Sequence, residues 1–379
     1  MNNSSSRVAI FLPALYGGGA ERTMLKLAGG IAERNYMVDL VLARARGPYL
    51  AEIPQKVRVI DLNASRDLFS LFSLVQYLRK ARPAVLFSGL HTNIIAIVAR
   101  KIAGVPTRLV VSERNTFSIR TESFSSDFRM RLMPKLVKLL YPLSDWVVAV
   151  SKGVAEDLVE QVGVPQERIT VIYNPVVTPE LKTKAADRLD HSWFKTGKPP
   201  VILSVGRLSI QKDFTTLISA FARVREASDA RLLILGEGDE RQALEDQIRK
   251  LGLEQHVCMP GFVTNPYPYM REATVFVLSS KYEGLPGVLI EALYCGTRLV
   301  ATDCPSGPRE VLCDGSYGQL VPVGDAELMA QAIGKALRED VSAAHEAGWK
   351  RFELETVVDQ YLDLFFGKRF HSCGEKESV

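Results

Sequence analysis

Residues 275–293, VFVLSSKYEGLPGVLIEAL, indicate how the chain folds. The apolar residues Val275–Leu278 have the character of a buried strand, a polar loop follows, and apolar residues then recur at helical spacing from Pro286 to Cys295. Pro286 suits the first helical position, where its missing N–H would have no partner in any case. A strand that leads through a loop into a helix is the repeating unit of a parallel sheet. This stretch therefore predicts an α/β fold.

The same alternation of short apolar runs and amphipathic helices occurs along most of the chain, in two series. The first series predicts strands at Val8–Leu12, Val38–Leu42, Val57–Ile60, Ala84–Phe87, Arg108–Val111 and Trp146–Val150. The second series predicts strands at Val201–Val205, Leu232–Leu235, Val257–Met259, Val275–Leu278, Leu299–Ala301 and Gln319–Val321. We therefore expect two doubly wound α/β domains that face each other across a cleft.

The boundaries of these domains follow from the polar stretch between the two series, which has little apolar period. The predicted parts are a first domain over 1–174, a connection over 175–200, a second domain over 201–353, a closing helix over 354–366 and a polar tail over 367–379. We expect the closing helix to pack back on the first domain.

The composition excludes several classes of protein. With 379 residues, 47% hydrophobic and 24% charged, the chain is neither disordered, fibrous nor stapled by disulfides. Apolar runs such as Ile94–Ala99 fall far short of the ~18 residues of a membrane-spanning helix. An exported protein is disfavoured, because Pro13 interrupts the apolar segment after Arg7. The five cysteines are odd in number and lack C-x-x-C spacing, so we expect reduced thiols in the cytoplasm at Cys258, Cys295, Cys304, Cys313 and Cys373.

Charge is distributed unevenly along the chain. Residues 1–150 hold 21 Lys and Arg against 10 Asp and Glu, a net charge of +11, whereas the remainder holds 26 against 33, a net charge of −7. A basic half predicts an anionic partner such as phosphate, an acidic lipid surface or nucleic acid. Nucleic acid is disfavoured, because no zinc, helix-turn-helix or RNA-binding motif accompanies the charge.

A basic amphipathic segment in this half, Phe128–Tyr141 (FRMRLMPKLVKLLY), favours the lipid surface. Its cations, interleaved with apolar residues, are Arg129, Arg131, Lys135 and Lys138. The alternative is an ordinary surface helix packed on its own domain, and Pro134 interrupts the pattern.

The loops after the strands hold the candidate binding residues, since ligands of doubly wound sheets bind there. After the first strand comes YGGGAE, in which Gly18 and Gly19 let backbone N–H groups approach an anion before a helix begins. The motif is not GxGxxG, and no acidic residue follows the second strand as a dinucleotide site requires, so NAD is disfavoured. A flexible turn without a ligand is the alternative.

Charged residues follow two strands of the second series. Arg207 and Lys212 share one loop ahead of a helix, and a guanidinium with an ammonium suits a diphosphate, unless both are solvated loop charges. Glu283 lies before the helix of the opening stretch, and Glu291 lies inside it beside apolar residues, where a carboxylate needs a partner. Sugar hydroxyls fit, because an ionised carboxylate can accept from both hydroxyls of a diol.

Glu283 and Glu291 are separated by seven residues in EGLPGVLIEAL, which resembles the E-x7-E element of retaining GT-B glycosyltransferases of family 4. From about Val8 to Phe366 the other segments match the family in order and spacing: GGGAER, VSKGVAEDL, VIYNP, SVGRLSIQKDF, LILGEGDE and MPGFV. The resemblance implies two Rossmann-like domains and transfer of a hexose-type sugar, with retention and without a metal or cofactor. The donor would be a nucleotide-diphosphate sugar, UDP before GDP. Many relatives glycosylate lipid-linked or lipid acceptors from the cytoplasmic membrane face while building bacterial surface polysaccharides, which implies an acceptor of this class.

The resemblance also implies roles for individual residues, with the acceptor on the first domain and the donor on the second. Arg207 and Lys212 would hold the donor diphosphate, Glu291 the ribose hydroxyls and Glu283 the hydroxyls of the transferred sugar. The backbone amides around the helix start would support the sugar and the phosphate; the residues there are Gly284, Leu285, Pro286 and Gly287. A second segment, formed by Gly261, Phe262 and Val263, would border the base.

The first domain departs from the family pattern. Many relatives carry a histidine after the strand Arg108–Val111, where this chain has SERN, so that Arg114 stands in the place of the histidine and its role is open. His91 follows another strand and is a candidate contact to the sugar or the acceptor, or a structural residue.

The expected chemistry is loss of a nucleoside diphosphate and attack by an acceptor hydroxyl, so the protein must stabilise developing negative charge. Arg207, Lys212 and a helix N-terminus would do so. No residue has to act as a covalent nucleophile. The resemblance favours attack from the face of the leaving group, and double displacement is the alternative. An epimerase of nucleotide sugars is the alternative, although it would not need a basic acceptor face. A two-domain sugar-binding receptor would need export and no diphosphate cations.

Overall fold

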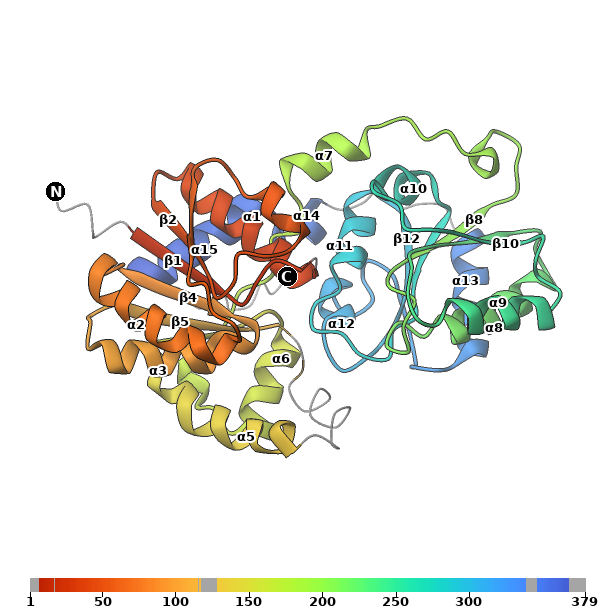
Figure 1. Cartoon of the computed structure of the whole chain (residues 1–379). Coiled ribbons are helices and arrows are strands. Elements are labelled where there is room, and N and C mark those ends of the chain that lie inside the picture. The colour runs from red at the N-terminus through yellow and green to blue at the C-terminus, as the bar shows by residue number, and fades with distance from the viewer. Residues whose placement is uncertain (1–6, 17, 115, 117–127, 339–345, 368–379) are drawn as a thin grey trace, which may run out of the picture.

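The computed structural model describes residues 7–16, 18–114, 116, 128–338 and 346–367, which form two α/β units side by side (Figure 1). Each unit is built on one parallel sheet with helices on both faces, an arrangement that buries the sheet from both sides. The predicted α/β class with two doubly wound, Rossmann-like domains is confirmed.

The first domain holds a seven-stranded sheet in the order β3-β2-β1-β4-β5-β6-β7. Its strands are β1 (Arg7–Leu12), β2 (Met37–Leu42), β3 (Val57–Asp61), β4 (Val85–Gly89), β5 (Arg108–Glu113), β6 (Trp146–Ala149) and β7 (Ile169–Val171). Its helices include α1 (Gly19–Glu33), α2 (Ser70–Ala81), α3 (Asn93–Ala103), α5 (Phe128–Leu140) and α6 (Lys152–Asp157). The edge strand β7 is missing from the sequence prediction, because three residues are too few to show a strand period.

The second domain holds a six-stranded sheet in the order β10-β9-β8-β11-β12-β13. Its strands are β8 (Val201–Val205), β9 (Arg231–Leu235), β10 (Val257–Gly261), β11 (Val275–Leu278), β12 (Arg298–Thr302) and β13 (Gln319–Val321). Its helices are α8 (Phe214–Arg225), α9 (Arg241–Lys250), α10 (Tyr267–Glu272), α11 (Gly287–Tyr294), α12 (Pro308–Val311), α13 (Ala326–Arg338) and α14 (Glu346–Lys350). Pro286 immediately precedes α11 rather than opening it.

In both sheets the strand order reverses beside the first strand of the domain. β1 lies between β2 and β4, so that Val8 is paired with both neighbours. β8 lies between β9 and β11, so that Ile202 is paired with both. The loops that leave such a pair of strands diverge, and the crevice between them is where doubly wound sheets bind ligands.

The last helix, α15 (Leu354–Phe366), completes the first domain, as Figure 1 shows by its blue ribbon among red and orange elements. The rings of Tyr361 and Phe365 pack against Phe87 of β4, with centroids 5.1 and 5.6 Å apart. Arg108 of β5 donates to the carbonyl of Phe365 at 2.7 Å. Residues 354–366, expected as a closing helix, thus lie against the sheet of the first domain.

The connection between the domains contains a short helix, α7 (Pro179–Ala185), which its weak apolar period does not predict. Thr178 caps this helix, accepting from the N–H of Leu181 at 3.2 Å, and Pro179 occupies the first helical position. A threonine followed by a proline is itself a helix-start signal, so local capping rather than periodicity identifies this element.

The chain crosses between the domains twice, and the two crossings are hydrogen bonded to each other. The N–H of Val176 donates to the carbonyl of Phe352 at 2.9 Å, and the N–H of Leu354 donates to the carbonyl of Val177 at 2.9 Å. The two crossings therefore form one narrow connection beside the last helix.

The basic segment forms α5, and the helix continues through Pro134. Across the described parts of the chain, no helix combines the length and apolar character that a membrane span requires. Four of the five cysteines lie in these parts and none is in a disulfide, while Cys373 lies outside them. Burial raises the pKa of Cys295 and of Cys304 to about 12.

Candidate active site

The candidate site lies at the reversal point of the second sheet, where two loops leave adjacent strands. The loop over 206–213 joins β8 to α8, and the loop over 279–286 joins β11 to α11. Both are strand-to-helix loops at the carboxyl edge of the sheet, so their side chains face the crevice that this topology creates.

Hydrogen bonds tie the two loops together. The hydroxyl of Ser279 donates to the carbonyl of Lys212 at 2.7 Å, and the N–H of Lys281 donates to the carbonyl of Gln211 at 2.8 Å. The side-chain amide of Gln211 donates in turn to the carbonyl of Tyr282 at 2.9 Å. The backbone at Gln211 and Lys212 is therefore held at a fixed place relative to the second loop.

An ion pair joins the two loops at their centre. Nζ of Lys212 lies 2.6 Å from Oε1 of Glu283, and the hydroxyl of Ser280 donates to the same oxygen at 2.7 Å. The side chains of Lys212 and Glu283 are only 17% and 9% exposed. A charged pair shielded from water in this way holds its geometry, and the ammonium keeps further N–H donors for a ligand.

Arg207 is exposed and makes no hydrogen bond or ion pair with any residue that the structure describes. The shape of its loop depends on two glycines that follow β9. A Cβ on Gly236 would lie 1.9 Å from the carbonyl oxygen of Gly206, and one on Gly238 would lie 2.2 Å from that of Leu208. Sequence analysis assigned these glycines no role, although glycines directly after a strand indicate a close backbone approach.

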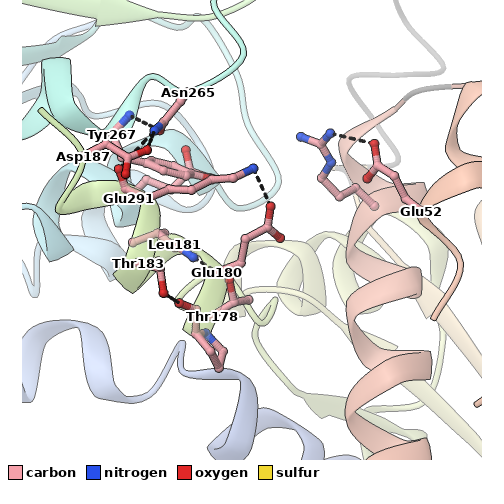
Figure 2. Close-up of polar contacts among 12 residues, drawn as sticks. Glu52, Thr178, Glu180, Leu181, Thr183, Asp187, Asn265, Tyr267 and Glu291 are labelled. Carbon is pink, nitrogen blue, oxygen red and sulfur yellow. Dashed lines mark hydrogen bonds and ion pairs between the residues drawn. The ribbon is translucent and has the colours of Figure 1, made fainter. Parts of the chain in front are cut away.

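Glu291 is half-buried on α11, on the crevice side of the site. The hydroxyl of Tyr267 on α10 donates to its Oε1 at 3.4 Å, and Figure 2 shows the two side chains next to each other. Burial raises the pKa of Glu291, and this effect outweighs the opposing influences of Lys26, Tyr267 and Arg22. Tyr267 is a further residue of the site that sequence analysis missed.

Lys26 and Arg22 come from α1 of the first domain, so charges of both domains act on Glu291. Burial also lowers the pKa of Lys26. Glu180 of α7 and Glu52 of the first domain act on Lys26 together with Glu291, and each of these carboxylates opposes the effect of burial. Glu291 thus lies where the second domain, the connection and the first domain meet.

The residues expected to border the donor lie in two segments, one between Glu283 and Glu291 and one at the end of β10. Gly284, Leu285 and Pro286 are buried, and Gly287 opens α11. Gly261 ends β10 with φ of +97°, a conformation that favours glycine, and turns the chain into Phe262, whose side chain is 73% exposed. Val263 is half-buried beside it.

On the first domain, Gly18 precedes α1 and its N–H donates to Glu21 at 2.9 Å. A Cβ on Gly19 would meet no atom of the described residues within 4 Å. Gly17 lies outside the described residues. The contacts of this loop within the protein therefore do not by themselves require glycine at position 19.

The two other candidates of the first domain contact protein groups and not the Glu283 cluster. His91 lies 2.8 Å from a carboxylate oxygen of Asp67 and is half exposed. Arg114 is buried, donates to Asn174 at 2.7 Å and contacts the sulfur of Met24, and burial lowers its pKa. The structure brings together Lys212, Glu283 and the segment 284–287, with Arg207 and Glu291 beside them.

Within the described parts of the chain, no three or more His, Cys, Asp or Glu side chains lie together so that they could hold a metal ion. Metal-independent transfer stays a prediction.

Comparison with known families accounts for both domains. A model described as glycosyl transferases group 1 matches residues 186–350, and a model described as glycosyltransferase family 4 matches residues 17–179. An N-acetylgalactosamine-N,N'-diacetylbacillosaminyl-diphospho-undecaprenol 4-alpha-N-acetylgalactosaminyltransferase of Campylobacter jejuni is 32% identical over 88% of this chain and 91% of the relative. The lipopolysaccharide core biosynthesis glycosyltransferase LpsE of Rhizobium meliloti is 29% identical over 93% of this chain and 96% of the relative.

Solved structures agree on the fold. HepE of Anabaena, in complex with UDP and glucose, matches with a TM-score of 0.75 over 95% of this chain and 99% of that one, at 21% identity. The lipopolysaccharide outer core galactosyltransferase WaaB matches with a TM-score of 0.72 over 95% and 99%, at 20% identity. The two family matches, the relative of 32% identity along most of the chain and the arrangement of the two sheets agree with one another. This chain therefore belongs to glycosyltransferase family 4 and is a glycosyltransferase with the GT-B fold.

Proposed function

We propose that the protein is a retaining glycosyltransferase that moves a hexose-type sugar from a UDP-sugar to a hydroxyl of a lipid-linked or growing bacterial surface glycan. The observation that carries this proposal is the shielded Lys212–Glu283 ion pair at the reversal point of the second sheet, with the exposed guanidinium of Arg207 on the same loop as Lys212. Cations there suit a diphosphate, and a carboxylate there suits sugar hydroxyls.

The reaction would proceed without a covalent enzyme intermediate. The bond between the anomeric carbon and the diphosphate oxygen breaks, and its electron pair leaves with the diphosphate, whose growing charge Arg207 and Lys212 stabilise. The acceptor hydroxyl attacks from the same face and passes its proton to a phosphate oxygen of the leaving group. Glu283 holds hydroxyls of the sugar, and Glu291 holds the ribose.

The names of the relatives support the acceptor class. Two Campylobacter jejuni relatives are named as transferases that act on diphospho-undecaprenol glycans, and relatives from Rhizobium meliloti and Erwinia amylovora are named for lipopolysaccharide core and amylovoran synthesis. UDP is preferred as the nucleotide because HepE, a structural neighbour, was solved with UDP-glucose.

Exposed residues of the first domain support docking of the enzyme on an anionic membrane surface from the cytoplasmic side. On α5, Val137 is buried while Leu136 and Leu139 are exposed beside two exposed cations, Lys135 and Lys138. The side chains of Arg129 and Arg131 lie outside the described ones. At the start of α2 lies a second exposed apolar group, formed by Leu68, Phe69 and Phe72. Apolar residues next to cations suit the interface of an anionic bilayer.

Calorimetry of the purified chain with UDP, GDP and ADP tests the donor assignment. We expect UDP to bind, and Arg207→Ala and Lys212→Ala to weaken the binding. Absence of binding by all three nucleotides would overturn the proposal. A second measurement, analysis of the products from UDP-glucose and UDP-N-acetylgalactosamine, separates transfer from epimerisation, because an epimerase returns a nucleotide-linked sugar of changed configuration.

A further inference from the structure

Two backbone N–H groups beside Glu283 have no hydrogen-bond partner among the residues that the structure describes. The residues Gly284 and Leu285 are buried, yet the backbone N–H of neither residue donates a hydrogen bond to any residue that the structure describes. Buried N–H groups are paired in more than about 90% of cases, so an unpaired neighbouring pair points to a ligand. The direction of these two N–H groups is therefore a functional property of the loop.

The first of these N–H groups is oriented by a residue of the first domain. The hydroxyl of Thr116, which follows β5, donates to the carbonyl of Glu283 at 3.2 Å, and Thr116 is buried. In a trans peptide the C=O and the N–H point in opposite directions. Fixing the carbonyl of Glu283 on Thr116 therefore fixes the N–H of Gly284 away from it.

The second N–H group is oriented through a pair of serines. The hydroxyl of Ser306 donates to the carbonyl of Gly284 at 2.9 Å, and its oxygen lies 2.7 Å from the hydroxyl of Ser151 at the end of β6. Because Ser306 uses its proton on Gly284, Ser151 is the donor within the pair. The N–H of Leu285 is thus directed by Ser306 of the second domain, whose hydroxyl is in turn held by Ser151 of the first domain.

Close packing makes the serine contact depend on where the first domain lies. Gly153, two residues after Ser151, approaches the loop before α12 so closely that a Cβ there would lie 2.9 Å from the carbonyl oxygen of Pro305 and 3.0 Å from Cβ of Ser306. Its N–H donates to Oε1 of Glu310 at 3.1 Å. A shift of the first domain by the width of a methyl group would therefore separate the two serines.

We propose that Thr116 and the Ser151–Ser306 pair are positioning residues that align the N–H groups of Gly284 and Leu285 with the donor only when the first domain is in contact. This inference rests on the proposed function. Arg207, Lys212 and Glu291 all belong to the second domain and bind the nucleotide by themselves. Alignment of the two N–H groups adds stabilisation of the departing diphosphate, so donor cleavage requires contact between the domains.

Thr116→Val in the full-length chain tests the first contact, because valine keeps the shape of threonine and removes the hydroxyl. Thr116→Ser restores a hydroxyl, and Ser306→Ala tests the second contact. The matched control is Thr183→Val, since the hydroxyl of Thr183 also donates to a carbonyl, that of Pro179, but on α7 (Figure 2). Three quantities are measured: the Kd of UDP by calorimetry, protection of the peptide containing Gly284 and Leu285 from hydrogen exchange by UDP, and acceptor-free release of UDP from UDP-N-acetylgalactosamine and UDP-glucose.

We expect Thr116→Val and Ser306→Ala each to lower UDP release roughly tenfold and to reduce the protection by UDP, while the Kd of UDP rises by about threefold or less. Thr116→Ser and Thr183→Val should behave as the unchanged chain does. Wild-type protection in Thr116→Val, equal losses in Thr116→Ser, or a Kd that rises in step with the loss of release would overturn the inference. Failure of the unchanged chain to bind UDP would instead overturn the proposed function.

Discussion

Removing Lys212 should affect stability and activity in separable ways. In Lys212→Ala, Glu283 keeps the hydroxyl of Ser280 but loses the ammonium at 2.6 Å, and its side chain, 9% exposed, gains little from water. Leaving one member of a shielded ion pair without its partner costs about 3–5 kcal/mol when burial is complete. Because Lys212 is 17% exposed, we expect about 2–3 kcal/mol of lost unfolding free energy. Activity should fall roughly 10²-fold or more, as on removal of a preorganised donor.

The double variant Lys212→Ala with Glu283→Gln distinguishes the two effects. It removes both charges, so unfolding free energy should recover by at least about half of the single-variant loss, whereas UDP-sugar turnover should stay at the level of Lys212→Ala. Urea unfolding and UDP release provide the two measurements. The matched control is Lys281→Ala, a half-exposed lysine of the neighbouring loop. Additive stability losses, or turnover within about threefold of the unchanged chain in Lys212→Ala, would refute the assignment of this pair.

Four further predictions follow from individual contacts. Arg207→Ala should lower turnover roughly 10²-fold without changing urea unfolding, because Arg207 has no partner among the described residues; a loss of stability would show an unrecognised structural contact. Burial raises the pKa of Glu291, so the contribution of this carboxyl group to stability is present at acidic pH and is lost as pH rises through its folded-state pKa. Glu291→Gln should therefore stabilise the ligand-free protein at neutral pH and lose this advantage on acidification. The same variant should raise the KM for the donor. Arg114→Met should cost about 1–3 kcal/mol of unfolding free energy, since it leaves Asn174 without its donor, and unchanged stability with reduced turnover would instead indicate a role at the donor sugar. The amount of protein that pellets with anionic vesicles should decrease as the salt concentration rises, and equal pelleting with neutral vesicles would refute docking by charge. Replacing four cationic residues by glutamine should also decrease it, whereas the control variant Arg249→Gln with Lys250→Gln on α9 should not. The four cations are Arg129, Arg131, Lys135 and Lys138.

The sequence predicts the fold well where a pattern repeats and less well where a single contact decides the structure. Twelve predicted strands are present, because parallel strands buried on both faces are short apolar runs that alternate with amphipathic helices. The edge strand β7 escapes this pattern because it has three residues. The helix α7 escapes it because its start depends on the cap at Thr178 and not on apolar spacing.

The same division applies to the site. Lys212 and Glu283 are predicted from their positions after strands, and Glu291 from its place among apolar residues inside a helix, which are local properties of the sequence. Thr116 and Ser151 are not, because their contacts with Glu283 and Ser306 join segments more than 150 residues apart. Neither Thr116 nor Ser151 has a neighbour in sequence that would indicate such a contact.

Arg207 and Lys212 are unequal cations, and the difference indicates how the donor is received. Lys212 is held on Glu283 by one of its three N–H donors, so its position is fixed before a ligand arrives and the other donors remain for a phosphate oxygen. Arg207 is exposed and loses side-chain freedom only when it meets an anion. In the proposed function Glu283 receives the sugar, and Lys212 holds this carboxylate. Binding of the diphosphate and placement of the sugar would then be coupled through one ammonium group. UDP, which lacks the sugar, should therefore still bind at Lys212, but its binding cannot use Glu283. We expect Glu283 to contribute more than Arg207 does to the preference of the protein for a UDP-sugar over UDP.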